Sequence, residues 1–306
     1  EHFHAGDQLN AAGMGSGIST NLNLAKNMEK ALMAEPSYFR ISLSGFYQET
    51  YEKGHVGGDI EVVKQNMIAL QEIKQRLGLR TRVDVYYHRY LDNIEEESLM
   101  REFSERLGFM FTTGYSVMMP LEKTLALIEG DSSVTDTDRE TLKRLALPPY
   151  DDLVNLVRQY PKQACTLKDN WLVLDCNGNT ILCCSVFNQT EFQLGKYLDV
   201  PLPQLTRLKY TQQNCVDMCN RCAKNGMHIY ATLPNHGPLK EHAVNRIIDF
   251  QRRTIVGLPI ESDKLGRTGE VSAENFDEAQ YLQMNQDVKH AIATGAFTSG
   301  YQHYVL

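Results

Sequence analysis

Cysteine is the residue type with the most chemical potential in this chain, and all of its cysteines lie in one short stretch. The seven are Cys165, Cys176, Cys183, Cys184, Cys215, Cys219 and Cys222 of 306 residues. An odd number, an adjacent pair and a closely spaced triplet fit a disulfide framework poorly. Thiolates are the natural ligands of soft metals, so the pattern favours a metal or iron–sulfur site in a reducing compartment.

Four of the cysteines are the best candidates for one shared site. Asn177-Gly178 predicts the tight turn of a β-hairpin whose second strand ends at the cysteine pair. Side chains alternate between the faces of a strand, so Cys183 and Cys184 point in opposite directions and we assign only Cys183. The ligands that we assign are Cys165, Cys183, Cys219 and Cys222. Four thiolates suit a 4Fe–4S cluster in which every iron has a cysteine ligand, and they suit a zinc site equally well. A third interpretation is that these cysteines are small buried thiols of the core.

The overall composition excludes several classes of protein. The chain is 42% hydrophobic and 23% charged, which is globular, and at about 150 residues per domain its length suggests two domains. A formal charge of −7 argues against a nucleic-acid partner. No run approaches the roughly 18 apolar residues of a membrane span. No signal peptide is visible after Glu1, so we expect a cytoplasmic protein.

The N-terminal part has the pattern of an α/β protein. Strand-like runs at 18–22, 38–43, 82–87 and 109–117 alternate with helical runs at 24–33, 60–77 and 95–107. Asp59 is a suitable N-cap for the longest helix, and Gly78 suits the left-handed residue that ends it. This alternation predicts parallel βα units with functional groups at the C-terminal ends of the strands.

The remaining chain divides into smaller parts. Residues 120–160 look helical, a hairpin and a short helix follow, and a turn-rich break at 234–238 precedes a helix at 239–253. A polar linker at 261–273 leads to a last helical unit. We therefore expect a partial barrel at 1–160, a cysteine-rich hairpin and helix domain at 161–234, a helix and linker at 235–273, and a helical tail at 274–306.

Several segments, taken in their order along the chain, resemble radical S-adenosylmethionine (radical SAM) proteins with a C-terminal SPASM or twitch auxiliary-cluster domain. The matching segments are ISTNL at 18–22, ISLSG at 41–45, YEKGHVGGDIE at 51–61, YYHRY at 86–90, the hairpin at 171–184, and 219–228. The resemblance covers about residues 10–230. It implies a partial (βα)6 barrel that cleaves SAM reductively to a 5′-deoxyadenosyl radical, and it implies that the four cysteines hold an auxiliary 4Fe–4S cluster.

The resemblance also implies partners and SAM-binding residues. Thr20, Asn21 and Ser42, at two strand ends, would approach the ribose and amino acid of SAM, and Arg89 would pair with its carboxylate in a two-pronged contact. The ordinary alternative is that such polar residues only cap the next helix. An electron donor such as flavodoxin or ferredoxin is implied, whereas the small-molecule, sugar or peptide substrate is left unidentified.

The chain departs from the family pattern in its cysteines. The triplet Cys215, Cys219 and Cys222 has the C-x3-C-x2-C spacing of the SAM cluster, but it follows the βα units, and Arg221 stands where an aromatic residue is usual. We therefore do not assign the triplet to SAM. The family's own motif and its Gly-Gly-Glu segment would precede residue 18 and are missing, so we expect a fragment or a lost SAM cluster. This chain alone would then be inactive, and the alternative function is a non-catalytic zinc-binding interaction module on a degenerate barrel.

The C-terminal segments resemble a second family. Residues 276–288 and 295–304 are similar to a small module that is appended to many bacterial glycosyltransferases, with Gln286 where proline is usual and the Gly-rich ending missing. This resemblance implies a bacterial biosynthetic setting without naming a substrate.

Overall fold

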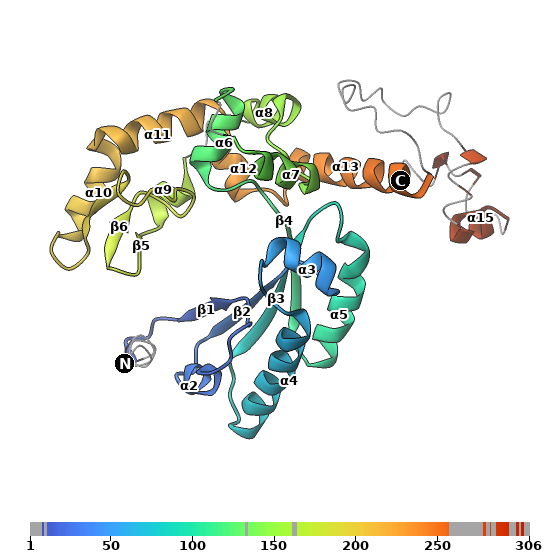
Figure 1. Cartoon of the computed structure of the whole chain (residues 1–306), viewed down its shortest axis with the longest axis horizontal. Coiled ribbons are helices and arrows are strands. Elements are labelled where there is room, and N and C mark those ends of the chain that lie inside the picture. The colour runs from blue at the N-terminus through green and yellow to red at the C-terminus, as the bar shows by residue number, and fades with distance from the viewer. Residues whose placement is uncertain are drawn as a thin grey trace. The chain divides into compact units, whose positions relative to one another are not determined.

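The computed structural model describes residue 8, residues 11–131, 134–160 and 164–256, and short stretches between 278 and 302 (Figure 1). The chain forms two compact units, Glu1–Gly257 and Leu258–Leu306. The second unit contains α15 (Gln286–Ala293), in which Val288 is buried. The polar linker predicted at 261–273 lies outside the described residues.

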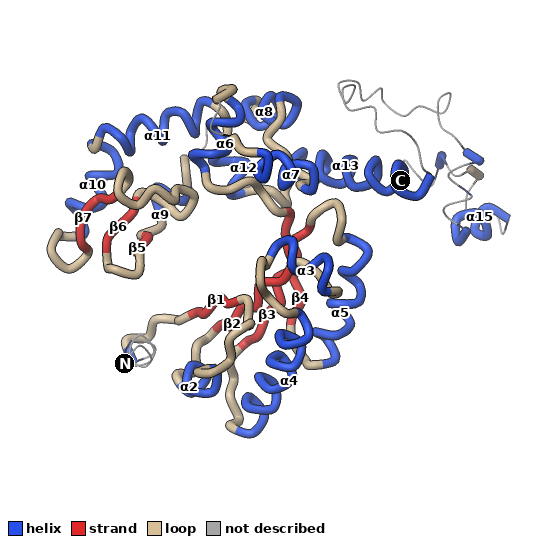
Figure 2. The backbone as a smooth tube through the Cα atoms, viewed as in Figure 1, coloured by secondary structure: helices blue, strands red, loops and turns tan. Residues whose placement is uncertain are grey.

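The first unit begins with a parallel sheet, as the alternating pattern predicts. Its order is β1-β2-β3-β4, and all three pairings are parallel (Figure 2). The strands are β1 (Gly17–Thr20), β2 (Tyr38–Leu43), β3 (Arg82–Arg89) and β4 (Met110–Tyr115). The helices between them are α2 (Met28–Met33), α3 (Gln48–Gly54), α4 (Ile60–Arg76) and α5 (Glu97–Arg106), with a 3-10 turn η1 (Ile94–Glu96) before α5. A mixed α/β fold is thus confirmed, and its closure into a partial barrel stays a prediction.

The ends of α4 follow the predicted local chemistry. The Asp59 carboxylate accepts hydrogen bonds from the backbone N–H groups of Glu61 at 2.8 Å and Val62 at 3.1 Å. These two donors have no partner inside the helix, so the side chain satisfies them. Gly78 has φ +64°, which glycine adopts without steric cost, and the helix ends just before it.

The two faces of the parallel sheet differ in chemistry. One face carries apolar side chains that pack on α2, α4 and α5 in a single core. The members from β2 and β3 are Phe39, Ile41, Leu43, Val83, Val85 and Tyr87. Because strand side chains alternate, the residues between them point to the opposite face. They are Tyr38, Arg40, Ser42, Asp84, Tyr86 and His88, so this second face is largely polar.

The rest of the first unit is helical apart from a small antiparallel sheet. Its helices are α6 (Leu121–Ile128), α7 (Asp136–Arg144), α8 (Asp151–Arg158), α9 (Thr166–Asn170), α10 (Leu202–Thr211), α11 (Gln213–Lys224), α12 (Met227–Thr232) and α13 (Gly237–Val256). The strands are β5 (Val173–Leu174), β6 (Asn179–Ile181) and β7 (Gln193–Lys196), in that order. One hydrophobic core joins these elements, with members from Leu125 in α6 to Ala243 in α13.

The predicted β-hairpin is present between β5 and β6. The Asp175 carboxylate accepts from the N–H groups of Asn177 and Asn179, both at 2.8 Å, and Gly178 has φ +77°. This is the turn chemistry that Asn-Gly predicts. The boundaries predicted at 160, 234 and 273 stay predictions. Within the described residues, no helix combines the length and the apolar character that crossing a membrane requires.

Candidate metal centre

The four cysteines assigned to a metal site line one cavity. The cavity has a volume of about 30 Å³. Its cysteine lining is Cys165, Cys183, Cys219 and Cys222. Most of the other walls are apolar, and Lys168 and His228 also line it. The structure therefore brings together thiols from three segments of the chain that are up to 57 positions apart in the sequence (222 minus 165).

Each thiol reaches the cavity from a different kind of local structure. Cys165 is the N-cap residue of α9, and Cys183 follows the end of β6. Cys219 and Cys222 lie three residues apart on α11, a spacing that puts both side chains on one face of the helix. All four are half-buried. The site thus depends on the packing of α9, the hairpin and α11 against one another.

The three cysteines that were not assigned lie away from this cavity. Cys184 is exposed and lines a second, open pocket of about 350 Å³ beside β5, which Cys183 also lines. Both cysteines follow the end of β6, so strand alternation does not separate them as predicted. Cys176 is exposed in the hairpin turn. Cys215 is fully buried in the hydrophobic core. The C-x3-C-x2-C triplet consequently lies inside one helix and turns its first thiol into the core.

Burial keeps three of the cavity thiols, those of Cys183, Cys219 and Cys222, protonated in the absence of metal. It raises the pKa of Cys183 to about 11, and it raises the pKa values of Cys219 and Cys222 as well. For Cys222 the charges of the other three thiolates add to the effect of burial. A bound cation would reverse this balance, because ligating thiolates are stabilised by the positive charge.

Backbone N–H groups face two of the sulfurs. Those of Ser185 and Val186 face the Cys183 sulfur, and that of His228 faces the Cys222 sulfur, and each lowers the pKa of its thiol. Hydrogen bonds to sulfur are a normal feature of cysteine-ligated metal centres, where they stabilise the ligating thiolates. The donor set and its surroundings therefore fit a four-thiolate centre.

The cavity leaves free space between the four cysteines. A volume of about 30 Å³ exceeds the roughly 10–15 Å³ that a cavity needs to hold one water molecule. Within the ranges that the structure describes, no three His, Cys, Asp or Glu side chains stand close enough together to hold a metal ion as they are. Metal binding therefore requires an adjustment of the cysteine side chains.

The predicted SAM-binding residues at the ends of β1 and β2 have local roles. Thr20 Oγ1 accepts from the N–H of Leu22 at 3.0 Å, and Asn21 Oδ1 accepts from the N–H of Asn23 at 3.2 Å. These bonds close local turns rather than capping α2, the role that the ordinary alternative predicts, because the N-cap of α2 is Asn27. Ser42 is half-buried on the polar face of the sheet. A contact of these residues with SAM stays a prediction.

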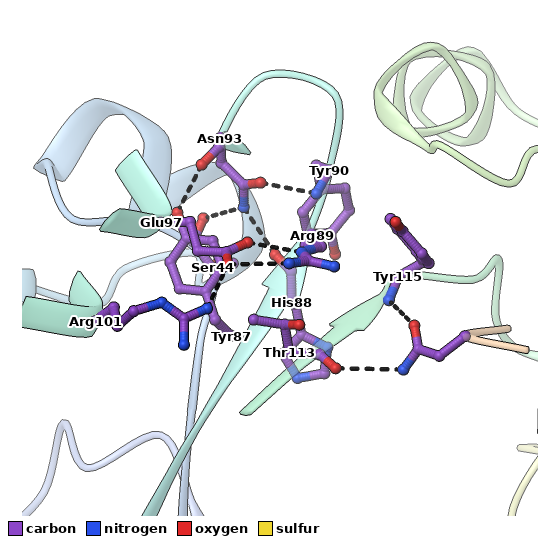
Figure 3. A network of polar contacts seen from close by, with 11 residues as sticks. Ser44, Tyr87, His88, Arg89, Tyr90, Asn93, Glu97, Arg101, Thr113 and Tyr115 are labelled. Atoms are coloured by element: carbon purple, nitrogen blue, oxygen red, sulfur yellow. Dashed lines mark hydrogen bonds and ion pairs between the residues drawn. The ribbon is translucent and has the colours of Figure 1, made fainter. Parts of the chain in front are cut away.

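Arg89, at the end of β3, already has an acidic partner. Its Nε and Nη2 donate to the Glu97 carboxylate at 2.6 and 3.0 Å, and Arg101 donates to the same carboxylate at 2.8 Å (Figure 3). These hydrogen bonds from Arg89 hold the pKa of Glu97 below its usual range, although burial acts in the opposite direction. A ligand carboxylate would have to replace Glu97 to form the predicted two-pronged contact.

A buried asparagine, which the sequence analysis missed, joins the C-terminal ends of the strands. Asn93 Nδ2 donates to the carbonyl oxygens of Ser44 at 2.9 Å and His88 at 2.8 Å, and its Oδ1 accepts from the N–H of Tyr90 at 2.8 Å (Figure 3). Asn93 is 1% exposed. An asparagine just after a strand gives no signal of this role, because its partners are set by the packing of two strands.

A second group that was missed lies on the polar face of the sheet. Asp84, in the middle of β3, is fully buried and accepts from the hydroxyls of Tyr38 and Thr112, the latter at 2.9 Å. Arg40 Nε lies 3.6 Å from the same carboxylate, and its guanidinium lies 4.5 Å from the centre of the Tyr86 ring. A charged residue inside a predicted strand is the only sequence signal for this cluster.

Comparisons with known proteins do not assign a function to the chain. No protein-family model matches the chain, and the comparison with curated proteins finds no match. A function for the chain therefore has to come from the residues around the cavity and at the strand ends.

Proposed function

We propose that Cys165, Cys183, Cys219 and Cys222 hold an auxiliary 4Fe–4S cluster, and that the chain serves a radical SAM enzyme that modifies its substrate through a 5′-deoxyadenosyl radical. One observation carries the metal part of the proposal: thiols from α9, the hairpin and α11 line a single cavity. Four cysteine ligands leave no iron open, so the cluster would supply electron transfer or structural support rather than bind SAM.

The chain's own residues support such a centre in two ways. The backbone N–H groups of Ser185, Val186 and His228 face ligating sulfurs, and the mostly apolar walls exclude water from the thiols. Because buried thiols are protonated without metal, binding would release protons and would be stronger at higher pH. The parallel sheet adds the architecture that the radical SAM resemblance implies, without distinguishing it from other α/β proteins.

Zinc is the second candidate, because its ligand count is the same. A closed site of four cysteines is typical of structural zinc. The chain would then be a zinc-binding interaction module, and the centre would stabilise the fold around the hairpin. The thiolates would hold the ion without catalysing a reaction.

Metal analysis of the purified protein separates the two candidates. After anaerobic reconstitution with iron and sulfide, we expect a brown protein with about four irons per chain. Cys183→Ser should lose most of this iron, whereas Cys184→Ser, its matched control at the neighbouring exposed position, should keep it. One zinc per chain and no cluster would support the second candidate. A wild-type protein that binds neither metal would contradict both.

The SAM-binding part of the proposal needs its own measurement. In equilibrium dialysis with labelled SAM, Arg89→Met should weaken binding, because it removes the group expected to pair with the SAM carboxylate. Glu97→Gln should strengthen binding, since the neutral amide competes less well for Arg89. Affinities that are the same in all three proteins would refute the assignment of Arg89, and undetectable binding to the wild type would count against SAM.

A further inference from the structure

Lys209, in the last turn of α10, is buried although lysine is rarely buried without a partner. It is 2% exposed. Its Nζ donates to the carbonyl oxygen of Lys168 at 3.0 Å and to that of Trp171. Among the described residues, no carboxylate forms an ion pair with Lys209 within 4 Å. Two backbone carbonyls therefore provide its hydrogen bonds, and the Asp169 carboxylate of α9 acts on its charge from beyond that distance.

The two carbonyls belong to the segment that carries Cys165. Lys168 lies in α9 and Trp171 is the C-cap residue of that helix, while Cys165 is the N-cap residue. The last carbonyls of a helix have no partner within it, and a lysine ammonium can satisfy them. Lys209 thus attaches α9 to α10, and α9 is the element that brings the first thiol to the cavity.

The negative charges that act on Lys209 are those of Asp169 and of the cavity thiolates. When they are ionised, Cys183, Asp169, Cys219 and Cys165 all oppose the lowering of the Lys209 pKa by burial. A divalent ion with four thiolates carries a net negative charge, and a buried cation beside it offsets part of that charge. A loaded site would therefore add to the negative charge that Asp169 already supplies.

We propose that Lys209 is a positioning residue of the cysteine-lined site: its ammonium fixes α9, and with it Cys165, and offsets the negative charge of the loaded centre. This inference rests on the proposed metal centre and adds a residue outside the four ligands.

Binding of Co²⁺ alone tests the proposal, because Co²⁺ held by four thiolates has a visible absorption band that reports its affinity. Lys209→Met keeps most of the side-chain volume and removes both the hydrogen bonds and the charge. Substitution of a residue that supports a metal ligand typically weakens metal binding about 10- to 100-fold, and we expect a loss of this size. Arg207→Met is the matched control, since Arg207 is an exposed cation on the same helix, and it should bind like the wild type.

A second measurement examines the protein without metal. If Lys209 fixes α9, alkylation of Cys165 followed by mass spectrometry should be several-fold faster in Lys209→Met than in the wild type or Arg207→Met. Lys209→Gln keeps a donor for the carbonyls without the charge, so it should restore slow alkylation while Co²⁺ binding stays weak. Should the Met variant fail to fold, the Gln variant still separates the two roles.

The outcomes distinguish this inference from the proposed function. Equal Co²⁺ affinity and equal alkylation in Lys209→Met and the wild type would overturn the role of Lys209 and leave the metal centre intact. A wild type that binds no Co²⁺ would overturn the metal centre and the charge role together, and unchanged alkylation would then remove the positioning role as well.

Discussion

The junction between α11 and α12 offers a quantitative test of the packing that builds the candidate site. Gly226 lies at this junction, four residues after Cys222, with φ +70° and ψ 14°. A Cβ atom added there would lie 2.7 Å from Val157 Cγ2 and 2.9 Å from the Val157 carbonyl carbon and oxygen in α8. Real Cβ atoms do not come this close to backbone atoms, so Gly226→Ala must displace α8 or the junction.

Two effects add up in Gly226→Ala. The left-handed backbone is unfavourable by about 1–2 kcal/mol for a residue with a Cβ, and overpacking of a filled core adds about 1–3 kcal/mol. The free energy of unfolding should therefore fall by about 2–5 kcal/mol. Gly178→Ala is the matched control, because Gly178 has φ +77° and its added Cβ meets nothing within 4 Å. It should lose only the first contribution.

Urea unfolding followed by circular dichroism measures both variants. We expect Gly226→Ala to be less stable than Gly178→Ala by about 1–3 kcal/mol, which is the overpacking contribution. Equal losses in the two variants would refute the close contact between Val157 and Gly226, and with it the packing of α8 against the helix that carries Cys219 and Cys222. Weaker Co²⁺ binding in Gly226→Ala alone would show that this packing also holds the ligands in place.

Three further predictions concern pH and buried polar groups. Burial lowers the pKa of His88 to about 4, so the stability that depends on its neutral form is complete above its usual pKa of 6.5 and is lost as the pH falls towards 4. Unfolding experiments at pH 7 and pH 4 should show a loss of at most about 3 kcal/mol in the wild type that is missing in His88→Gln. Parallel pH profiles of the two proteins would contradict this prediction. Asn93→Ala leaves the Ser44 and His88 carbonyls without their donor, so urea unfolding should show a loss of about 2–4 kcal/mol, and a loss below about 1 kcal/mol would contradict the network. Because burial raises the pKa of Cys183 to about 11, the metal-free protein should lose stability as the pH rises from 9 towards 11, and Cys183→Ala should reduce that loss in alkaline unfolding experiments.

The features predicted from the sequence are those whose causes are local. Asp59 caps α4 through bonds to residues two and three positions later, and Asn177-Gly178 sets a turn through its own backbone conformation. The missed polar groups have distant partners instead. Asp84 accepts hydrogen bonds from Tyr38 and Thr112, 46 and 28 positions away. Strand register decides such pairs, and a single sequence does not contain it.

Arg89 shows a failure of a different kind. A guanidinium at a strand end correctly indicates a group that pairs with a carboxylate. The sequence does not say which carboxylate, and in the structure Glu97, eight positions later at the start of α5, accepts from its Nε and Nη2. The prediction of a residue type at a site is therefore stronger than the prediction of its partner.

The sequence predicts that the four cysteines come together, but it does not predict whether their site is empty or holds a metal. The same physical reason explains the success and the failure. The three-residue spacing on α11 directs Cys219 and Cys222 to one side, whatever they bind, whereas Cys183 lies past the end of β6, where strand alternation no longer applies. Protonated thiols are small and nearly apolar, so without metal they line a mostly apolar cavity. Ionised thiols repel one another and need a cation, which changes both the charge and the volume of the site. The same four residues therefore behave as core or as ligands according to their protonation, and Lys168 and Lys209 both act against the effect of burial on the Cys219 thiol, which favours its charged form.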